Sequence, residues 1–363
     1  MRILVAGGGT GGHLYPGIAI AKEFLRREPT GEILFVGTRN GLEATVVPRE
    51  GFALETIAVS GVVGKSLPAR LAGMARLPVG LAQAWAIVSR FRPDLAVGVG
   101  GYASGPAIWV AAKRGVPVLL QEQNLYPGTT NRWLAPLARL ICVAFAESRQ
   151  FFPPEKVVVT GNPIRRELLN SLSGTRRVRR EPPWTLLVFG GSQGSARLNR
   201  AMEEALGELE DYHQQLRIIH QTGHRHHEAV KKAYAAWPGQ AVVEPFLYDM
   251  AVHYREADLV VCRAGAMTVA EVLVALLPAI LVPFPHAVHD HQQINAQALE
   301  AQGAAEVLLD EECDGPRLAS SVRRLLEEPA RRQSMVAACE RLRVMDAAER
   351  IVDFGLKLVR EAA

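Results

Sequence analysis

The chain has 363 residues with a net charge of +4 at pH 7, and 48% of its residues are hydrophobic. This length predicts two domains of average size, and the composition is that of a soluble globular protein. The positive charge is small and dispersed, without a Lys/Arg block interleaved with aromatic residues, which excludes a nucleic-acid-binding groove.

The cysteines and the start of the chain bear on the compartment. The four cysteines are far apart and form neither a CxxC nor a Cys/His ligand pattern. Cys142 and Cys262 lie in apolar, strand-like runs, so we predict buried free thiols in a reducing compartment. No signal peptide precedes the first strand and no apolar run is long enough to span a bilayer, so we expect a cytoplasmic protein.

The first motif is a glycine loop, GGGTGGH at residues 7–13, between a strand at 3–6 and a helix at 14–27. Its spacing matches the GxGxxG pattern of dinucleotide-binding folds. The second strand, at 33–36, ends in Gly37-Thr38-Arg39 and lacks the acidic residue that holds a ribose in NAD enzymes. This disfavours an NAD-dependent oxidoreductase and leaves a loop whose backbone can approach an anion.

Further short apolar runs alternate with helix-length segments through the first half. They predict strands at 54–57, 95–99, 116–120, 140–143 and 157–160. This alternation is typical of a parallel sheet covered by helices on both faces. The segments GGYASGP at 100–106 and QEQN at 121–124 follow two of these strands, so we expect them at one edge of the sheet, where ligands of such folds bind.

Residues 61–92 contain Lys and Arg but neither Asp nor Glu. Two interpretations fit the helical spacing of apolar residues: a crossover helix packed on the core with a solvated basic face, or an amphipathic segment on an anionic membrane surface. The apolar residues with this spacing are Leu67, Leu71, Met74, Leu77, Leu81 and Trp85.

The second half repeats the plan of the first. A polar, Arg-rich connection at 171–184 leads to a strand at 186–189, a glycine loop GGSQGS at 190–195 and a helix from 196. Later strands are predicted at 217–220, 241–243, 259–261 and 279–282. We therefore predict two α/β domains facing each other across a cleft: residues 1–163 joined by a C-terminal helix at 343–363, and residues 164–342.

The stretch from Val260 to Glu271, VVCRAGAMTVAE, predicts a buried strand, a glycine turn and a helix with a carboxylate just past its first turn. A helix N-terminus holds phosphates, and Glu271 can accept hydrogen bonds from ribose hydroxyls. The alternative is an ordinary strand–helix turn with a solvated glutamate.

Residues 286–295, HAVHDHQQIN, are dense in polar groups. The spacing of the three histidines and Asp290 fits neither HExxH nor a zinc finger, so no metal site is predicted. Gln292, Gln293 and Asn295 suit sugar hydroxyls because neutral amides both donate and accept hydrogen bonds.

Eight motifs carry a family resemblance: GGGTGGHLYP, GVGGYASGP, QEQN, GNPIR, GGSQGS, HQTG, CRAGAMTVAE and DHQQINA. In this order and spacing, over nearly the whole chain, they resemble the MurG family of bacterial transferases. The resemblance implies a GT-B fold of two Rossmann-like domains, with no cofactor. It also implies transfer of N-acetylglucosamine from UDP-N-acetylglucosamine (UDP-GlcNAc) to the undecaprenyl-diphosphate-linked MurNAc-pentapeptide in peptidoglycan synthesis.

The resemblance implies that the C-terminal domain binds the donor and the N-terminal domain the acceptor. Glu271 would bind the ribose, Ser192 and the backbone at 266–268 the diphosphate, and Phe246 and Leu247 would lie near the uracil. The full set of implied substrate contacts is Thr10, Gly11, Gly12, Asn124, Arg165, Ser192, Phe246, Leu247, Arg263, Ala266, Met267, Thr268, Glu271, Gln292, Gln293 and Asn295. The family often has His at the position of Gln121, which leaves the role of this residue open.

The implied chemistry is a single displacement in which the C4 hydroxyl of the acceptor attacks the anomeric carbon and inverts it. His13 is the first candidate for the general base and Glu122 the second. The alternative for His13 is that it only orients the loop or the acceptor diphosphate. The rival function is an isomerase of the same architecture, a UDP-GlcNAc 2-epimerase, which would share the UDP site but lack a lipid-facing surface.

A lipid-linked acceptor favours the membrane interpretation of residues 61–92. We expect a peripheral enzyme on the cytoplasmic face of the cell membrane, bound to an anionic surface, with other cell-wall synthesis proteins as further partners. The predicted docking residues are Leu71, Met74, Leu77, Leu81 and Trp85, with Trp109 or Arg139 nearby.

Overall fold

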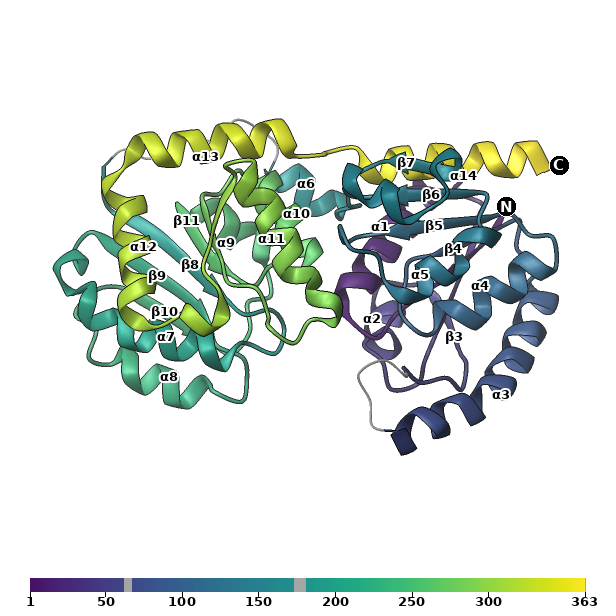
Figure 1. The fold of residues 1–363 in the computed structure, drawn as a ribbon, viewed down its shortest axis with the longest axis horizontal. Coiled ribbons are helices and arrows are strands. Elements are labelled where there is room, and N and C mark those ends of the chain that lie inside the picture. The colour runs from purple at the N-terminus through teal and green to yellow at the C-terminus, as the bar shows by residue number, and fades with distance from the viewer. Residues whose placement is uncertain (62–66, 173–180, 363) are drawn as a thin grey trace. The chain divides into compact units, whose positions relative to one another are not determined.

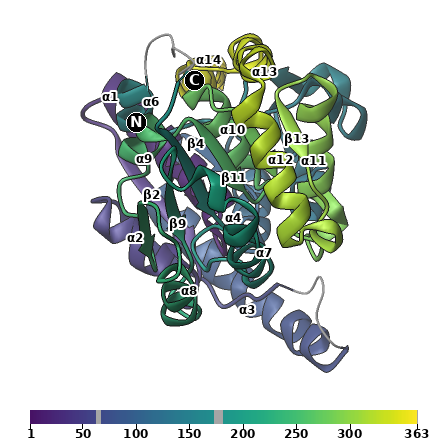
Figure 2. The ribbon, with the colours of Figure 1, turned by 90° about the vertical axis from the view of Figure 1, so that its left-hand side faces the viewer.

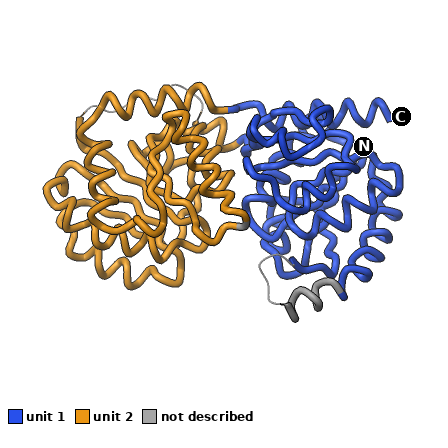
Figure 3. The backbone as a smooth tube through the Cα atoms, viewed as in Figure 1, with its two compact units in different colours: residues 1–166, 344–363 blue, residues 167–343 orange. Residues whose placement is uncertain are grey.

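The computed structural model describes residues 1–61, 67–172 and 181–362, and of residues 67–74 and 288 it describes the backbone alone. The chain divides into two compact units (Figure 3). The first is Met1–Arg166 with Val344–Ala363, and the second is Glu167–Arg343. The predicted boundaries after residues 163 and 342 lie close to these.

The first unit is built on a seven-stranded, wholly parallel sheet in the order β3-β2-β1-β4-β5-β6-β7. Its strands are β1 (Arg2–Ala6), β2 (Glu32–Gly37), β3 (Ala53–Thr56), β4 (Leu95–Gly98), β5 (Val118–Glu122), β6 (Leu140–Val143) and β7 (Val157–Val159). Its helices are α1 (Gly11–Arg27), α2 (Glu43–Arg49), α3 (Leu67–Phe91), α4 (Ser104–Lys113), α5 (Thr129–Leu134) and α14 (Ala347–Ala362).

Helices cover both faces of this sheet, because its strands are apolar on both sides. On one face α1 and α14 pack side by side, and Ile18, Phe24 and Ile351 are buried against the strands (Figure 1). On the other face α3, α4 and α5 contribute buried residues such as Ile87 and Ile108. The C-terminal helix thus belongs to the core of the first unit.

The second unit contains a six-stranded parallel sheet in the order β10-β9-β8-β11-β12-β13. Its strands are β8 (Trp184–Phe189), β9 (Leu216–Gln221), β10 (Ala241–Glu244), β11 (Leu259–Cys262), β12 (Ala279–Leu281) and β13 (Ala305–Val307). Its helices are α7 (Ala196–Glu208), α8 (His227–Tyr234), α9 (Met250–Glu256), α10 (Ala266–Ala275), α11 (His291–Ala301), α12 (Gly315–Glu327) and α13 (Pro329–Leu342), while α6 (Arg166–Leu172) begins at the unit boundary.

One face of the second sheet is covered by α7, α8 and α12, and α7 packs directly on α12 (Figure 2). The helices α9, α10, α11 and α13 form a second packed group. The predicted α/β class with two Rossmann-like parallel sheets is confirmed. All four cysteines are buried and free, as predicted for Cys142 and Cys262.

Both sheets reverse their strand order at one point, between β1 and β4 in the first unit and between β8 and β11 in the second. In open α/β sheets this reversal leaves room at the carboxyl edge, where ligands bind. The motifs GGGTGGH and GGYASGP follow β1 and β4, and GGSQGS and RAGAMT follow β8 and β11. The four glycine-bearing loops therefore lie at the two reversal points.

Candidate active site

The first glycine loop leads directly into α1, which begins at Gly11 rather than at the predicted residue 14. Gly11 and Gly12 of the motif therefore lie in the first turn of the helix, and Gly7, Gly8 and Gly9 precede it. Gly9 has a φ of +89°, a conformation that glycine adopts without strain. The first turn contains no acidic side chain, so the helix start presents unpaired backbone N–H groups and partial positive charge.

His13 projects from this first turn. Its Nδ1 lies 3.0 Å from the Thr10 hydroxyl. Its ring lies against Gly100 of the neighbouring loop, where an added Cβ would be 2.5 Å from His13 Cδ2 and 3.0 Å from Nε2. Gly101 lies equally close to the first glycine loop, because a Cβ at Gly101 would be 2.4 Å from the carbonyl oxygen of Gly8. The loops after β1 and β4 thus touch through glycines, and the imidazole lies at their junction.

Glu122 ends β5 and is 1% exposed. One carboxylate oxygen accepts hydrogen bonds from the Asn124 N–H at 3.0 Å and from its side-chain amide at 3.4 Å. The other accepts from the Gly128 N–H at 3.0 Å and from Asn131 Nδ2 at 2.9 Å. Burial raises the pKa of this carboxyl, and the N–H donors oppose that shift. The carboxylate therefore fixes the QEQN loop.

Gln121 is fully buried and donates a hydrogen bond to Asn162 Oδ1 at 3.1 Å. Its neighbour Gln123 donates to the carbonyl oxygen of Val99 at 2.9 Å. Gln121 thus joins a buried amide network, which gives this departure from the family pattern a structural role. Asn131, which holds Glu122, also approaches Gly100, where a Cβ would lie 3.6 Å from its Nδ2. Gly100 therefore lies close both to His13 and to the Asn131 amide that holds Glu122.

Arg165 also belongs to the first unit, and its guanidinium lies 5.1 Å from the centroid of the Tyr15 ring on α1.

In the second unit, the backbone of the GGSQGS loop contacts the backbone of the HQTG loop. A Cβ at Gly194 would lie 2.1 Å from the carbonyl oxygen of Thr222, and a Cβ at Gly223 would lie 2.1 Å from that of Gln193. Both glycines have positive φ angles. Ser192 lies at the exposed tip of the first loop. Only glycine permits this approach, which explains the residue type in both motifs.

Three buried side chains support the HQTG loop. His220 Nε2 lies 3.1 Å from Asn199 Oδ1, and its Nδ1 lies 2.9 Å from the Tyr234 hydroxyl. Asn199 in turn donates to the carbonyl oxygen of Thr222 at 2.9 Å. Burial lowers the pKa of His220 to about 3, so the imidazole is neutral at pH 7. The network joins α7 to the loop after β9.

The turn after β11 leads into α10, with Gly265 at the N-cap and no side-chain cap. Ala266 and Met267 are buried, Thr268 is half-buried, and the first turn holds no acidic residue. Glu271 lies further along the helix and accepts a 2.9 Å hydrogen bond from Tyr254, which is fully buried. The structure therefore places a partly exposed carboxylate, held by a buried tyrosine, just past a helix start that has no side-chain cap.

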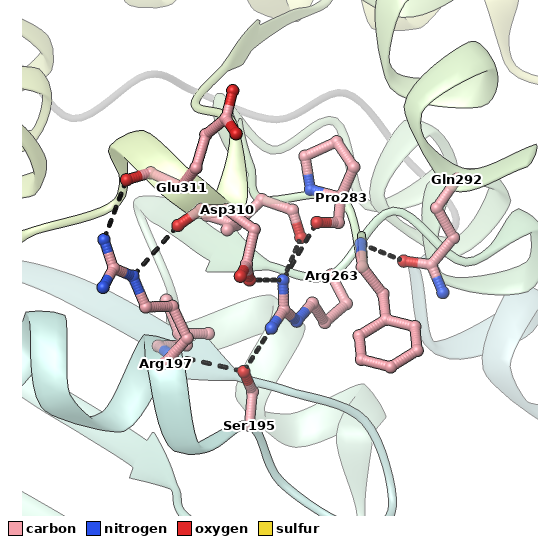
Figure 4. A network of polar contacts seen from close by, with 10 residues as sticks. Ser195, Arg197, Arg263, Pro283, Gln292, Asp310 and Glu311 are labelled. Carbon is pink, nitrogen blue, oxygen red and sulfur yellow. Dashed lines mark hydrogen bonds and ion pairs between the residues drawn. The ribbon is translucent and has the colours of Figure 1, made fainter. Parts of the chain in front are cut away.

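Arg263 lies at the centre of a polar network (Figure 4). It is 9% exposed, and its guanidinium donates to Asp310 Oδ1 at 2.5 Å and to the Ser195 hydroxyl at 2.6 Å. It also donates to the carbonyl oxygens of Val282 at 3.2 Å and Pro283 at 3.0 Å. Arg263, which the family resemblance implies is a substrate contact, thus joins the segments after β8, β11, β12 and β13.

The remaining predicted residues of this unit lie around the same edge. Gln292 accepts a 3.1 Å hydrogen bond from the Phe284 N–H, while Gln293 is half-buried and Asn295 fully buried on α11 (Figure 4). Leu247 is buried, with its N–H 3.4 Å from Gln221 Oε1. Phe246 packs edge to face on the exposed Tyr248. Within the described part of the chain, no three His, Cys, Asp or Glu side chains gather closely enough to hold a metal ion.

The predicted docking helix is α3. Its inner face buries Ala84, Ile87 and Val88, while Leu77 and Trp85 are 45% and 49% exposed. Leu81 packs partly on the core. The side chains of Leu71 and Met74 lie outside the described residues. Val79, which the sequence analysis did not name, is 52% exposed.

Positive charge lies beside this helix. The Arg114 guanidinium is 4.9 Å from the ring centroid of Trp85, and Lys113 lies 5.8 Å from that of Trp109. The described part of α3 therefore packs on the core through one face, as the crossover-helix interpretation predicts, and its other face exposes apolar residues. Membrane binding by that exposed face stays a prediction. Among the described helices, none is long and apolar enough to cross a membrane.

Comparisons with known proteins match both halves of the chain. Residues 3–143 match the glycosyltransferase family 28 N-terminal domain, and residues 185–351 match its C-terminal domain. A relative from Geobacter metallireducens is 48% identical over 97% of each chain. It is named UDP-N-acetylglucosamine--N-acetylmuramyl-(pentapeptide) pyrophosphoryl-undecaprenol N-acetylglucosamine transferase.

Solved structures show the same fold. MurG from Acinetobacter baumannii has a TM-score of 0.78 and 30% identity, covering 98% of this chain and 99% of its own. A UDP-GlcNAc 2-epimerase from Neisseria meningitidis, solved with UDP-GlcNAc, has a TM-score of 0.71 at 14% identity, covering 98% of this chain and all of its own. At that identity the epimerase shares the fold alone.

Proposed function

Because the chain belongs to glycosyltransferase family 28 and, within it, to the MurG enzymes, we propose that its two reversal points bind the two substrates of the MurG reaction. The protein is a hexosyltransferase of peptidoglycan synthesis. It transfers N-acetylglucosamine from UDP-GlcNAc to the undecaprenyl-diphosphate-linked MurNAc-pentapeptide. The isomerase alternative has less support, because its resemblance is one of fold alone.

The second unit binds the donor. The observation that carries this assignment is the uncapped start of α10 followed by Glu271, which Tyr254 holds through a 2.9 Å hydrogen bond. Backbone N–H groups at 266–268 and the exposed Ser192 bind the diphosphate, and Glu271 accepts hydrogen bonds from the ribose hydroxyls. Arg263 acts indirectly by holding the loops in place.

The ends of the donor are bound by the flanking loops of the same unit. Phe246 and the buried Leu247 lie beside the uracil. Gln292 and Gln293 bind the hydroxyls of N-acetylglucosamine, and Asn295, buried in α11, supports their loop. These residues come from the segments after β10 and β12. The strand β12 adjoins β11, and Gln221 at the end of β9 contacts both Leu247 and the carbonyl oxygen of Gly191 in the loop after β8.

The first unit binds the acceptor. Thr10, Gly11 and Gly12 at the start of α1 take its diphosphate, for the same physical reason as at α10. His13 projects from that turn and removes the proton from the attacking C4 hydroxyl. Glu122 positions the QEQN loop, because both of its oxygens are engaged by N–H donors. Asn124, which that loop carries, approaches the donor sugar.

The chemistry is a single displacement. The acceptor hydroxyl attacks the anomeric carbon as the bond to UDP breaks, so an α-linked donor gives a β-linked product. The electron pair of the broken bond leaves on the diphosphate, and the N–H groups at the start of α10 stabilise that charge. The proton of the hydroxyl moves to His13.

The exposed face of α3 docks the enzyme on the membrane that carries the acceptor. Leu77, Val79 and Trp85 supply apolar area, and Arg114 supplies the positive charge that anionic lipids attract. We propose a peripheral protein on the cytoplasmic face of the membrane, with other cell-wall synthesis proteins as further partners.

The test is incubation with radiolabelled UDP-GlcNAc and a short-chain analogue of the lipid acceptor. A labelled disaccharide product is expected, and conversion of UDP-GlcNAc without an acceptor would favour the isomerase. Glu271→Ala should weaken UDP-GlcNAc binding far more than acceptor binding. Equal loss of both affinities would contradict the assignment of the donor to the second unit.

A further inference from the structure

Glu43 is a buried carboxylate beneath the first glycine loop that the proposed chemistry does not use. It is the first residue of α2 and is 1% exposed. Its Oε2 accepts a 2.9 Å hydrogen bond from the N–H of Gly9. Its Oε1 accepts two more, both of 2.8 Å, from the backbone N–H and the hydroxyl of Thr38. The carboxylate therefore joins the end of β2 to the loop after β1.

Three glycines enclose this carboxylate. An added Cβ would lie 2.4 Å from Glu43 Cδ at Gly8, 2.4 Å from Cγ at Gly37 and 2.1 Å from Oε2 at Gly41. At distances below 3.0 Å, a side chain at any of these positions would require the Glu43 carboxylate to move. The loop after β1 and the connection from β2 to α2 thus close around one acidic group, and both approach it through glycines.

Glu43 is oriented differently from the acidic residue that follows the second strand in dinucleotide-binding enzymes. There the carboxylate after the second strand holds a ribose, whereas Glu43 accepts the loop's own N–H. With Gly9 N–H engaged, the donors left for a bound anion are those at the start of α1, beside His13. The placement of Glu43 thus favours a ligand other than a dinucleotide at this loop.

We propose that Glu43 is a positioning residue for the acceptor: by holding Gly9 it fixes the loop that carries the anion-binding helix start and His13. The proposal rests on the assignment of the acceptor to the first unit. Gly8 also touches Gly101 of the neighbouring loop, so a shift of Gly9 disturbs the surroundings of the imidazole on both sides.

The test compares Glu43→Gln with two controls, one within α2 and one at its C-cap. Glutamine keeps the shape but turns an NH₂ group toward a backbone N–H donor, so one hydrogen bond is lost. We expect the KM for the acceptor analogue to rise roughly tenfold or more, with the Kd for UDP unchanged. Glu50→Gln alters a surface pair with Lys22 and should change neither value.

The second control is Val47→Ala, which opens a cavity beneath α2 without touching the carboxylate. The two variants are compared at an equal fall in thermal midpoint. If Val47→Ala then raises the acceptor KM as much as Glu43→Gln does, the role of Glu43 is merely structural and the proposal is overturned. An acceptor KM within twofold of the wild type also overturns it.

A further variant covers the case in which Glu43→Gln does not fold. Thr38→Val removes only the hydroxyl donor to the same carboxylate and should raise the acceptor KM roughly threefold. No change in this variant contradicts the proposal. A wild-type protein that makes no disaccharide contradicts the proposed function instead, so the two failures are distinguishable.

Discussion

Arg263→Ala tests whether the loops around the donor depend on one buried guanidinium. The change removes the hydrogen bonds to Asp310 and Ser195 and leaves the Asp310 carboxylate without its cation. Breaking a buried ion pair costs about 3–5 kcal/mol. The Asp310 side chain is 19% exposed and can regain some hydration, so we expect about 2–3 kcal/mol.

This loss should lower the thermal midpoint of the second unit by about 4–12 °C, at about 2–4 °C per kcal/mol for a unit of this size. Calorimetry with and without UDP measures both the midpoint and the added stability from the ligand. The matched control is Arg200→Ala, whose side chain is 74% exposed and pairs with Glu204, for which we expect under about 1 kcal/mol.

A double-mutant cycle with Asp310→Asn separates the pair from general damage. Asp310→Asn removes the charge that Arg263 balances. In that background Arg263→Ala should lower the stability less than it does alone, with a coupling energy of about 1–3 kcal/mol. Additive effects, or equal shifts for Arg263→Ala and Arg200→Ala, would refute the view that this pair holds the donor loops.

Three further predictions concern the base, the membrane face and pH. His13→Ala should lower kcat by about 100-fold or more with an unchanged Kd for UDP, and near-normal turnover would remove the base assignment. Leu77→Glu with Val79→Glu should reduce cosedimentation with anionic vesicles, whereas unchanged binding would mean that this face does not dock. The side chains of Leu77 and Val79 are exposed, so these substitutions leave the inner face of α3, which packs on the core, unchanged. His220 has a pKa of about 3 in the folded chain against 6.5 as its ordinary value, so the unfolded chain binds a proton that the folded one does not. Stability should therefore fall as pH drops below about 6.5, by about 1 kcal/mol at pH 5.5. Urea unfolding of His220→Gln should show a flatter pH dependence, and an equal slope would contradict this.

The fold and the site loops could be predicted because their signals are local. Apolar runs such as 95–99 end in glycine turns, and this pattern by itself predicts buried parallel strands with ligands at their carboxyl ends. Glu271 could be placed past a helix start for the same reason. Each of these features depends on residues within a dozen positions of one another.

The burial of Glu43 and the ion pair of Arg263 could not be predicted in this way. Glu43 lies in a polar stretch that resembles a solvated helix start, and its burial depends on loops that approach from elsewhere in the sheet. Arg263 follows β11, but its partner Asp310 belongs to a turn after β13. A partner so distant in sequence leaves no local pattern. The closely spaced glycines at 37 and 41 were the one available signal for Glu43.

The burial of every cysteine has a practical consequence. Burial raises the pKa of the Cys142 thiol to about 12, and it raises the pKa values of the other three thiols as well. None of them forms the reactive thiolate at neutral pH. A single cysteine engineered on the surface of each unit should thus take a maleimide dye selectively in the native background. Fluorescence energy transfer between two such dyes would then report whether the halves of the molecule move when substrates arrive.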